Sequence, residues 1–219
     1  MNEAEASPLH IAAHGKGWLV VEKPAGLSVH NDPDRDLISL MARFPGFGLH
    51  AVHRLDRDTS GLILLACRRD VFHALNHQFT QGKVDKEYLA LVHGRLEQPP
   101  DRQWANWDFS LAKTSGGRTN IPGNGKRLPC LTRYRVEGST NRYTLLRCRL
   151  VTGRKHQIRR HAALAGHPVL GDRRYGSSRA CRYLARHHHF TRLALHAALL
   201  RFQPPEAAAY SVLQSSRLP

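Results

Sequence analysis

Apolar residues in this chain occur in short runs, each bounded by charged or turn-forming residues. The runs at 18–21, 62–67 and 88–92 are only four to six residues long, which favours buried strands over helices. The segment 142–151 alternates apolar and basic side chains, a pattern typical of a strand with one solvated face. A last apolar segment, 193–202, is expected to complete the core.

Helices are predicted at 37–44, 71–81 and 155–165. The second of these places Phe72, Leu75 and Phe79 at helical spacing. Each of the three segments is followed within two residues by a glycine, a residue at which helices commonly end. The mixture of strands and helices predicts an α+β fold.

The chain shows no internal repeat and no low-complexity linker, and its 219 residues suffice for one sizeable domain. Residues 1–15 resemble a loose leader, and residues 16–219 are predicted to form a single domain. The stretch at about 99–129 is rich in Gly, Pro, Asn and Arg without a sustained period. It is predicted to be an irregular surface insertion.

The charge of the chain points to a class of partner. It contains 33 Lys and Arg residues and only 17 Asp and Glu residues, which gives a net charge of +16. Fourteen of the cations lie between Arg142 and Arg201, where the only acid is Asp172. Such a concentration predicts a surface that attracts a polyanion. No apolar run approaches the roughly 18 residues of a membrane span, and the N-terminus lacks the features of a secretory signal or mitochondrial leader.

The four cysteines lie far apart and form no CxxC pair, which favours free thiols in a reducing compartment over disulfides or a zinc site. The run His187-His188-His189 is also a poor metal site. Three consecutive side chains of a regular element cannot all point at one ion, and no Cys or carboxylate follows closely. It is interpreted as a surface loop, and the protein as cytoplasmic.

The densest candidate for chemistry is the run 53–61, HRLDRDTSG, immediately before the buried strand at 62–67. Polar residues on an exposed loop at the end of a rigid strand are well placed to form a site. Asp56 lies between Arg54 and Arg57, and a guanidinium packed against it would keep its carboxylate ionised. Such an Asp can act as a nucleophile or general base. A structural Asp that caps a turn fits the local pattern equally well.

The longer run HRLDRDTSGLILLA resembles the active-site motif of the RluA-type RNA pseudouridine synthases: HRLD, two variable residues, TSG and an apolar strand. Four further segments resemble this family in the same order along the chain. They are KPAGLSVH at 23–30, KEYLALVHG at 86–94, TGRKHQIRRHAALAGHPVLGDRRYG at 152–176 and LALHA at 193–197. Any one of these matches alone would be weak evidence. Together they cover most of the chain from residue 18 to residue 202.

The resemblance implies that the protein isomerises uridine in RNA to its C-glycoside, pseudouridine, without a metal or organic cofactor. It implies a largely antiparallel mixed sheet in two halves, flanked by helices, with a catalytic cleft between the halves. Asp56 matches the catalytic aspartate, which either attacks the substrate or removes a sugar proton. Tyr88 matches an aromatic residue that stacks on the uracil, and Arg159 matches an arginine that pairs with the aspartate.

A base inside folded RNA must be extruded before it can react, which costs a few kcal/mol that phosphate contacts must offset. Arg54 is the candidate for filling the gap left by the flipped base, or alternatively for a salt bridge that supports the loop. Lys86 is a candidate phosphate contact or a solvated strand-edge lysine. Ile158 packs either under the base or in the core. The possible RNA-backbone contacts on the helix predicted at 155–165 and just before it are Arg154, Lys155 and Arg160.

Many family members carry an additional N-terminal RNA-binding module of the S4 type. Only about 15 residues precede the first expected core strand here, so the catalytic domain is expected to recognise ribosomal or transfer RNA alone, as a monomer. A non-catalytic RNA-binding protein that kept the fold is the alternative, although binding alone does not require Asp56, Tyr88 and Arg159 together. A nuclease or phosphotransferase would need an acidic cluster for metal ions, which the motif lacks.

Overall fold

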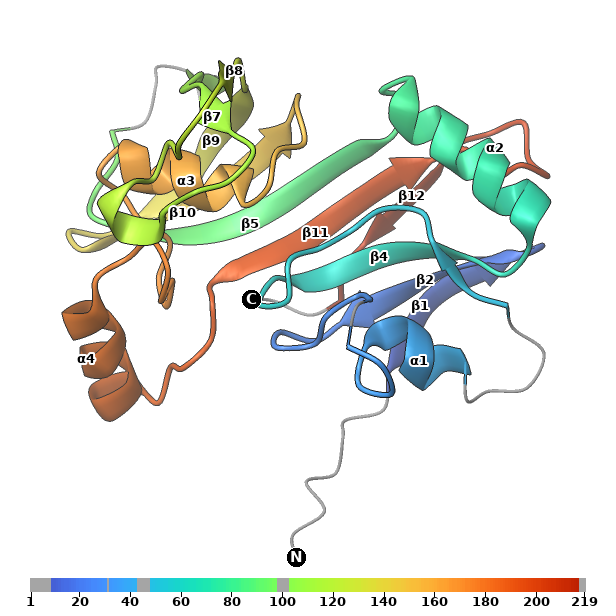
Figure 1. Cartoon of the computed structure of the whole chain (residues 1–219), viewed down its shortest axis with the longest axis horizontal. Helices are drawn as coiled ribbons and strands as arrows, with labels where there is room; N and C mark the ends of the chain where they lie inside the picture. Colours follow the sequence, from blue (N-terminus) through green and yellow to red (C-terminus); the bar gives the residue numbers. More distant parts are fainter. Residues whose placement is uncertain (1–8, 31, 43–47, 98–102, 217–219) are drawn as a thin grey trace, which may run out of the picture. The chain divides into compact units, whose positions relative to one another are not determined.

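The structure, a computed structural model, describes residues 9–30, 32–42, 48–97 and 103–216. The chain forms two compact units (Figure 1). The first comprises residues 1–84 and 199–217, and the second is built from residues 85–198. Strand β11 (Leu195–Phe202) contributes residues to both units.

The first unit is built around strand β4 (Ser60–Ala66), in which every residue is buried. Strand β2 (Trp18–Lys23) pairs with β4, and β1 (His10–Gly15) pairs with the other edge of β2. The two-residue strand β3 (His50–Ala51) also pairs with β4, and β12 (Ser211–Gln214) pairs with the C-terminal half of β11. All of these pairs are antiparallel.

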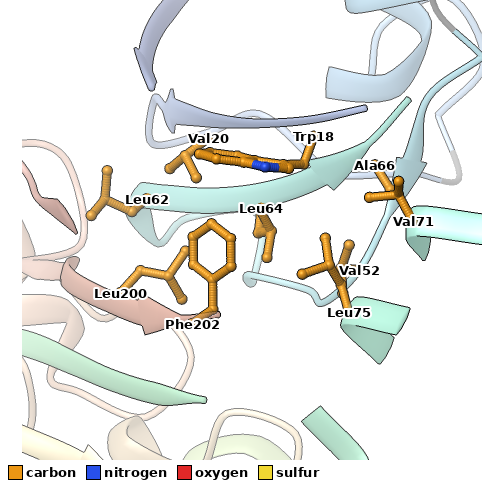
Figure 2. Packing of buried hydrophobic residues seen from close by; sticks show 10 residues of the cluster. All are labelled: Trp18, Val20, Val52, Leu62, Leu64, Ala66, Val71, Leu75, Leu200 and Phe202. Atoms are coloured by element: carbon orange, nitrogen blue, oxygen red, sulfur yellow. The ribbon is translucent and has the colours of Figure 1, made fainter. Parts of the chain in front are cut away.

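One face of this sheet packs against helix α2 (Arg69–Thr80) through a cluster of ten buried side chains (Figure 2). β2 and β4 contribute alternate residues, because successive side chains of a strand point to opposite faces. The ring of Phe202, on β11, meets that of Trp18 edge to face with centroids 5.1 Å apart. Val71 and Leu75, one turn apart on α2, complete the cluster. Helix α1 (Leu37–Ala42) buries Leu37 and Met41.

The second unit carries the strands β5 (Asp85–His93), β10 (Tyr143–Leu150), β9 (Thr132–Ser139) and β6 (Ala105–Trp107), hydrogen-bonded in that order. These pairs are antiparallel as well. On one face the buried residues include Tyr88, Leu146 and Cys148, and helix α3 (Gln157–Leu164) packs near β9. The opposite face carries the basic side chains Arg147 and Arg149, so the predicted alternation of 142–151 is confirmed.

Two parts of the chain are more regular than the sequence predicts. Residues 10–15 of the expected leader form β1, while residues 1–8 lie outside the described part. Residues 178–188 form helix α4 (Ser178–His188), so His187 and His188 end a helix and the surface-loop interpretation is wrong for them. They are nevertheless exposed, as is His189, which follows the helix with a left-handed backbone. The predicted helix end at residues 43–44 lies outside the described residues.

The predicted insertion at 99–129 is only partly irregular. Besides β6 it contains β7 (Leu111–Ala112), which pairs with β8 (Arg127–Leu128), and a 3-10 turn, η2 (Gly117–Thr119). Residues 98–102 lie outside the described part. The α+β fold with a largely antiparallel sheet, as the family resemblance implies, is confirmed.

Candidate active site

The loop that precedes β4 begins at His53, and this residue attaches the loop to the first unit. The backbone N–H of Leu64 donates to Nε2 of His53 at 3.0 Å, and the His53 ring stacks on Phe79 of α2 with centroids 4.9 Å apart. Leu55, two residues further on, is buried. The backbone N–H of Thr59 then donates to the carbonyl of Asp56 at 3.1 Å and closes a turn over 56–59.

A buried lysine ties this turn to the segment that follows β2. Lys23 is only 1% exposed. Its Nζ donates to the carbonyls of Pro24, Leu27 and Arg57 at 2.9, 2.7 and 3.0 Å. An ammonium group has three donors, so all of them are used. Gly26 and Arg57 add a reciprocal contact, because the Gly26 N–H donates to the Arg57 carbonyl and Arg57 Nε donates to the Gly26 carbonyl, both at 2.9 Å.

This arrangement explains the turn residues of the KPAG segment. Gly26 has a φ of +88°, a backbone conformation that glycine adopts without the steric penalty of a side chain. Its carbonyl and N–H then both face Arg57. The sequence resemblance includes Lys23, but it does not reveal that the lysine is buried and holds the loop of Asp56. This role depends on two segments more than thirty residues apart, which no local pattern records.

Two carboxylates act on the charge of Lys23 but do not outweigh its burial. Burial lowers the pKa of the Lys23 ammonium to about 8, although the carboxylates of Asp58 and Asp56 act in the opposite direction. Between pH 8 and 10.5 the folded protein has lost a proton that the unfolded chain still holds. This group's contribution to stability therefore rises with pH across that window, while the positive charge beside the loop disappears.

The family resemblance implies pseudouridine formation. For that reaction we expect the Lys23→Met variant to be slower than the wild type, because three carbonyls lose their donor and the 56–59 turn loosens. The wild-type rate should fall as the pH rises through about 8, since a neutral amine offers only two donors for three carbonyls. Single-turnover rates between pH 6.5 and 9.5 test this expectation. The exposed Lys16 supplies a control variant, Lys16→Met, which should keep the wild-type profile. A fall near pH 8 that persists in Lys23→Met would assign it to another group.

Asp56 itself is half-buried at the start of the turn, between the buried Leu55 and the exposed Arg57. The guanidinium of Arg57 is directed to the Gly26 carbonyl. Arg54 is exposed, as a residue that contacts RNA must be, and its predicted role stays a prediction. The turn-capping alternative is compatible with the backbone bond from the Thr59 N–H to the carbonyl of Asp56.

In the second unit, Arg159 of α3 forms a buried ion pair with Asp172. Its Nε donates to Oδ2 at 2.7 Å and its Nη2 to Oδ1 at 2.8 Å, and the two side chains are 4% and 0% exposed. Asp172 also accepts from the backbone N–H groups of Arg174 and Tyr175. Burial alone would raise the pKa of Asp172. The Arg159 guanidinium and the two N–H groups outweigh burial and lower it.

This pairing was not predicted from the sequence, where Arg159 is assigned to the catalytic aspartate. A guanidinium carries five N–H donors, and the bidentate bond to Asp172 uses two of them. The pair fixes the plane of the guanidinium. Its assignment to Asp56 therefore stays a proposal.

A hydrogen-bonded chain of three side chains lies beside this ion pair. The Tyr175 hydroxyl is 2.8 Å from Nδ1 of His156 and 2.6 Å from Oγ of Ser115, and the Tyr175 ring lies 5.3 Å from the Arg159 guanidinium carbon. Burial lowers the pKa of His156 to about 3, with three nearby cations acting in the same direction. His156 is therefore a neutral ring at physiological pH, and it precedes α3 with a left-handed backbone, φ +55°.

The other predicted substrate contacts have mixed surroundings. Tyr88 of β5 is 5% exposed and lies opposite Cys148 in the register. Lys86 is partly exposed, and burial lowers the pKa of its ammonium. Ile158 is 4% exposed, which agrees with the core alternative. Arg154 and Lys155 are exposed and stay candidates for RNA contact.

Arg160 cannot contact RNA as predicted, because it is buried at 1% exposure. Its guanidinium donates to the carbonyls of Ile121, Pro122 and Ala112 at 2.9, 2.7 and 3.0 Å, and to that of Lys155 at 3.3 Å. It therefore fastens the 99–129 segment to α3. A ring nitrogen of His161 adds a contact to the Phe109 carbonyl at 2.9 Å.

Replacing Arg160 by Met is expected to lower the free energy of unfolding by about 3 to 5 kcal/mol, because four carbonyls lose a charged donor in a buried site. Urea unfolding measures this change. The exposed neighbour Arg154 provides the control variant Arg154→Met, which should shift the unfolding free energy by no more than about 0.5 kcal/mol. Equal effects of the two substitutions would refute the anchoring role of Arg160.

Carboxylates from distant strands also reduce the charge predicted for 142–201. Arg147 forms ion pairs with Glu87 and Glu137 at 3.0 and 2.8 Å, and Arg149 donates to Glu87 at 2.6 Å. Together with Arg159, which pairs with Asp172, at least three of the fourteen cations thus have carboxylate partners. The sequence places no acid close to these arginines, so this neutralisation was not predictable from local spacing.

Within the described residues, the structure brings together no group of three or more His, Cys, Asp or Glu side chains that could hold a metal ion. Across that same part of the chain, each helix is too short or too polar to cross a bilayer.

Comparison with known proteins places this site in context. The sequence pattern of the family described as RNA pseudouridylate synthase matches residues 17–164, which include Asp56, Tyr88 and Arg159. The protein named ribosomal large subunit pseudouridine synthase D from Zymomonas mobilis is 37% identical over 93% of this chain. Ribosomal large subunit pseudouridine synthase C from Escherichia coli is 37% identical over 85% of it. The matches span 68% and 60% of these two relatives.

Solved structures are similar as well. The human protein named RNA pseudouridylate synthase domain containing 1 matches 99% of this chain and 86% of its own, with a TM-score of 0.76 and 26% identity. The human protein named RNA pseudouridylate synthase domain containing 4 matches 95% of this chain and 88% of its own, with a TM-score of 0.71. At 24% identity, this second likeness supports the fold alone.

Proposed function

Because this chain belongs to the RNA pseudouridylate synthase family, we propose that it converts uridine in RNA to pseudouridine. The observation that carries the proposal is the family match over residues 17–164, which includes all three residues assigned to the reaction. The rigid attachment of the 56–59 turn through Lys23 supports a catalytic role for Asp56, since catalytic groups need a fixed geometry.

In the proposed reaction, the bond between N1 of uracil and C1′ of ribose breaks while the base stays bound. The uracil rotates and a bond forms between C5 and C1′. The proton on C5 is then lost to solvent, and N1, which carries no proton in uridine, takes one up. Asp56 either attacks the substrate or removes a proton from the sugar. As the family resemblance implies, Tyr88 stacks on the uracil and Arg159 pairs with the Asp56 carboxylate. No step requires a metal or organic cofactor.

The target uridine must leave its RNA stack before it can react, and we propose that the enzyme flips it. Arg54 then occupies the space that the base leaves, and Arg154, Lys155 and Lys86 contact the RNA backbone. Ribosomal RNA of the large subunit is the proposed substrate, because the curated relatives carry that name. Transfer RNA is the alternative. We further propose that the protein acts in the cytoplasm as a monomer.

Mapping of pseudouridine in total RNA from cells with and without the gene tests this function. We expect at least one pseudouridine in large-subunit ribosomal RNA to disappear in the deletion strain and to return with the wild-type gene. If a gene that encodes Asp56→Asn also restores this pseudouridine, Asp56 is not the catalytic residue. Unchanged modification in the deletion strain, together with RNA binding by the purified protein, would favour the non-catalytic RNA-binding alternative.

A further inference from the structure

Helix α4 presents a row of arginines to solvent. Arg179, Arg182 and Arg186 are spaced three and four residues apart, so they lie on one side of the helix. All three are exposed, and the helix contains no acidic residue. Leu184, on the opposite side, is 4% exposed and attaches the helix to its own unit. The outward side of α4 is therefore strongly positive over a length of about 10 Å.

A hollow of about 280 Å³ adjoins this row. Arg173 and Arg182 line it together with the ring of Phe190 and the side chains of Cys181 and Thr191. No Asp or Glu is among its lining residues. A concave surface with two guanidinium groups and an aromatic ring is suited to an anion that carries a planar group.

The nearest acid in the sequence does not neutralise this region. Asp172 precedes Arg173 directly, but its side chain is fully buried and accepts the bidentate bond from Arg159. Arg147 and Arg149, by contrast, are paired with carboxylates. The unequal distribution of acids thus divides the basic tract into a neutralised part and a part whose charge faces solvent. We name the second part, Arg173, Arg179, Arg182, Arg186 and Phe190, the α4 surface.

We propose that the α4 surface binds the phosphodiester backbone of the substrate RNA, at residues other than those assigned to catalysis. This inference rests on the proposed function, which makes RNA the substrate. A guanidinium matches the oxygens of a phosphate through parallel N–H bonds, and a row of three can reach successive phosphates. The surface anchors the RNA while the chemistry takes place at the uridine.

The chemistry of the helix favours RNA over a membrane surface. A basic helix that lies on a bilayer needs a free apolar side to enter the lipid. The apolar side of α4 carries Leu184, which is already buried within the protein. The outward side offers the arginines and one exposed aromatic ring, Tyr183, which is 45% exposed. That combination resembles the basic and aromatic surfaces that bind nucleic acid.

The test is a triple variant, Arg179→Gln with Arg182→Gln and Arg186→Gln, in the full chain. Its control removes three exposed cations of the first unit, Arg35→Gln with Arg69→Gln and Lys83→Gln. Dissociation constants for a large-subunit ribosomal RNA transcript are measured at several salt concentrations. We expect the slope of log K against log salt to become shallower by about 2 to 3 in the α4 variant, because each lost phosphate contact removes about 0.7 to 0.9. The control should change the slope by less than 1.

A second readout is the single-turnover rate of pseudouridine formation at saturating RNA, which should equal that of the wild type. Wild-type affinity and slope in the α4 variant, or an equal change in the control, would overturn the proposal. So would a lower saturating rate with unchanged affinity. If the triple variant unfolds, Arg186→Gln alone should make the slope of log K against log salt shallower by about 0.7 to 0.9. Loss of binding to phosphatidylserine vesicles with unchanged RNA affinity would assign the surface to membranes.

The two proposals can fail separately. A wild-type protein that binds RNA but forms no pseudouridine would refute the proposed function, and the salt series would still test the α4 surface. A wild-type protein that forms pseudouridine, combined with an α4 variant of unchanged RNA affinity, would refute the α4 surface alone.

Discussion

Replacing Asp56 by Asn is expected to slow pseudouridine formation by at least about 100-fold, because a neutral amide can neither attack the substrate nor accept its proton. The substitution preserves the shape of the side chain, and the backbone bond between Asp56 and Thr59 does not depend on the carboxylate. RNA affinity and stability should therefore stay close to those of the wild type. Release of tritium from RNA labelled at C5 of uridine measures the rate.

Asp58→Asn is the matched control for this variant. Asp58 is exposed, lies in the same turn and, like Asp56, favours the charged form of Lys23. Its loss removes the same charge at nearly the same place, but the control variant should release tritium at nearly the wild-type rate. If Asp58→Asn is as slow as Asp56→Asn, the charge around Lys23 is what matters, and the assignment of Asp56 as the reacting group is wrong.

Asp172→Asn is expected to lower the free energy of unfolding at pH 7 by about 3 to 5 kcal/mol, since it leaves the guanidinium of Arg159 buried without its counter-charge. Asp70→Asn breaks the exposed ion pair with Arg68 and should leave the stability close to that of the wild type, because solvent screens a surface pair. Urea unfolding of the two variants and the wild type gives both differences. Similar small effects would mean that the buried pair contributes no more than a surface pair.

The effect of Asp172→Asn should depend on pH in a defined direction. The pKa of this carboxyl is lower in the folded protein than in the unfolded chain. Its stabilising contribution is therefore fully present above about pH 4 and is lost as the pH falls through the folded value. The stability difference between the wild type and Asp172→Asn should shrink between pH 4 and pH 2. A constant difference over that range would show that the carboxylate charge is not its source.

Elements with a strong apolar pattern were predictable from the sequence. β4 is a continuous apolar run because both faces of the strand are covered, and α2 shows the spacing of Val71, Leu75 and their neighbours that meets the sheet. β1 was missed because its strand pairing with β2, rather than its own weak apolar pattern, holds it in place. α4 was missed because one buried leucine and a Ser177 cap suffice to dock an otherwise basic helix.

The local candidates for the site were also predictable, but their partners were not. The motif identifies Asp56 because the reacting group and its turn are adjacent in sequence. The lysine that holds this turn lies 34 residues from its acceptor Arg57. Three of the four carbonyls that Arg160 binds lie 38 to 48 residues away. Burial converts Arg160 from a candidate RNA contact into an internal anchor. Only the folded chain distinguishes such arginines from those of the α4 surface.

Product analysis after a single turnover tests the central claim most directly. Purified protein is incubated with a large-subunit ribosomal RNA transcript without any added cofactor. The nucleosides are then separated by chromatography and identified by mass spectrometry. We expect one or more uridines to be replaced by pseudouridine at unchanged mass, with one C5 tritium released per residue converted. Bound RNA whose uridines are all unchanged, or RNA that is cleaved instead, would contradict the account.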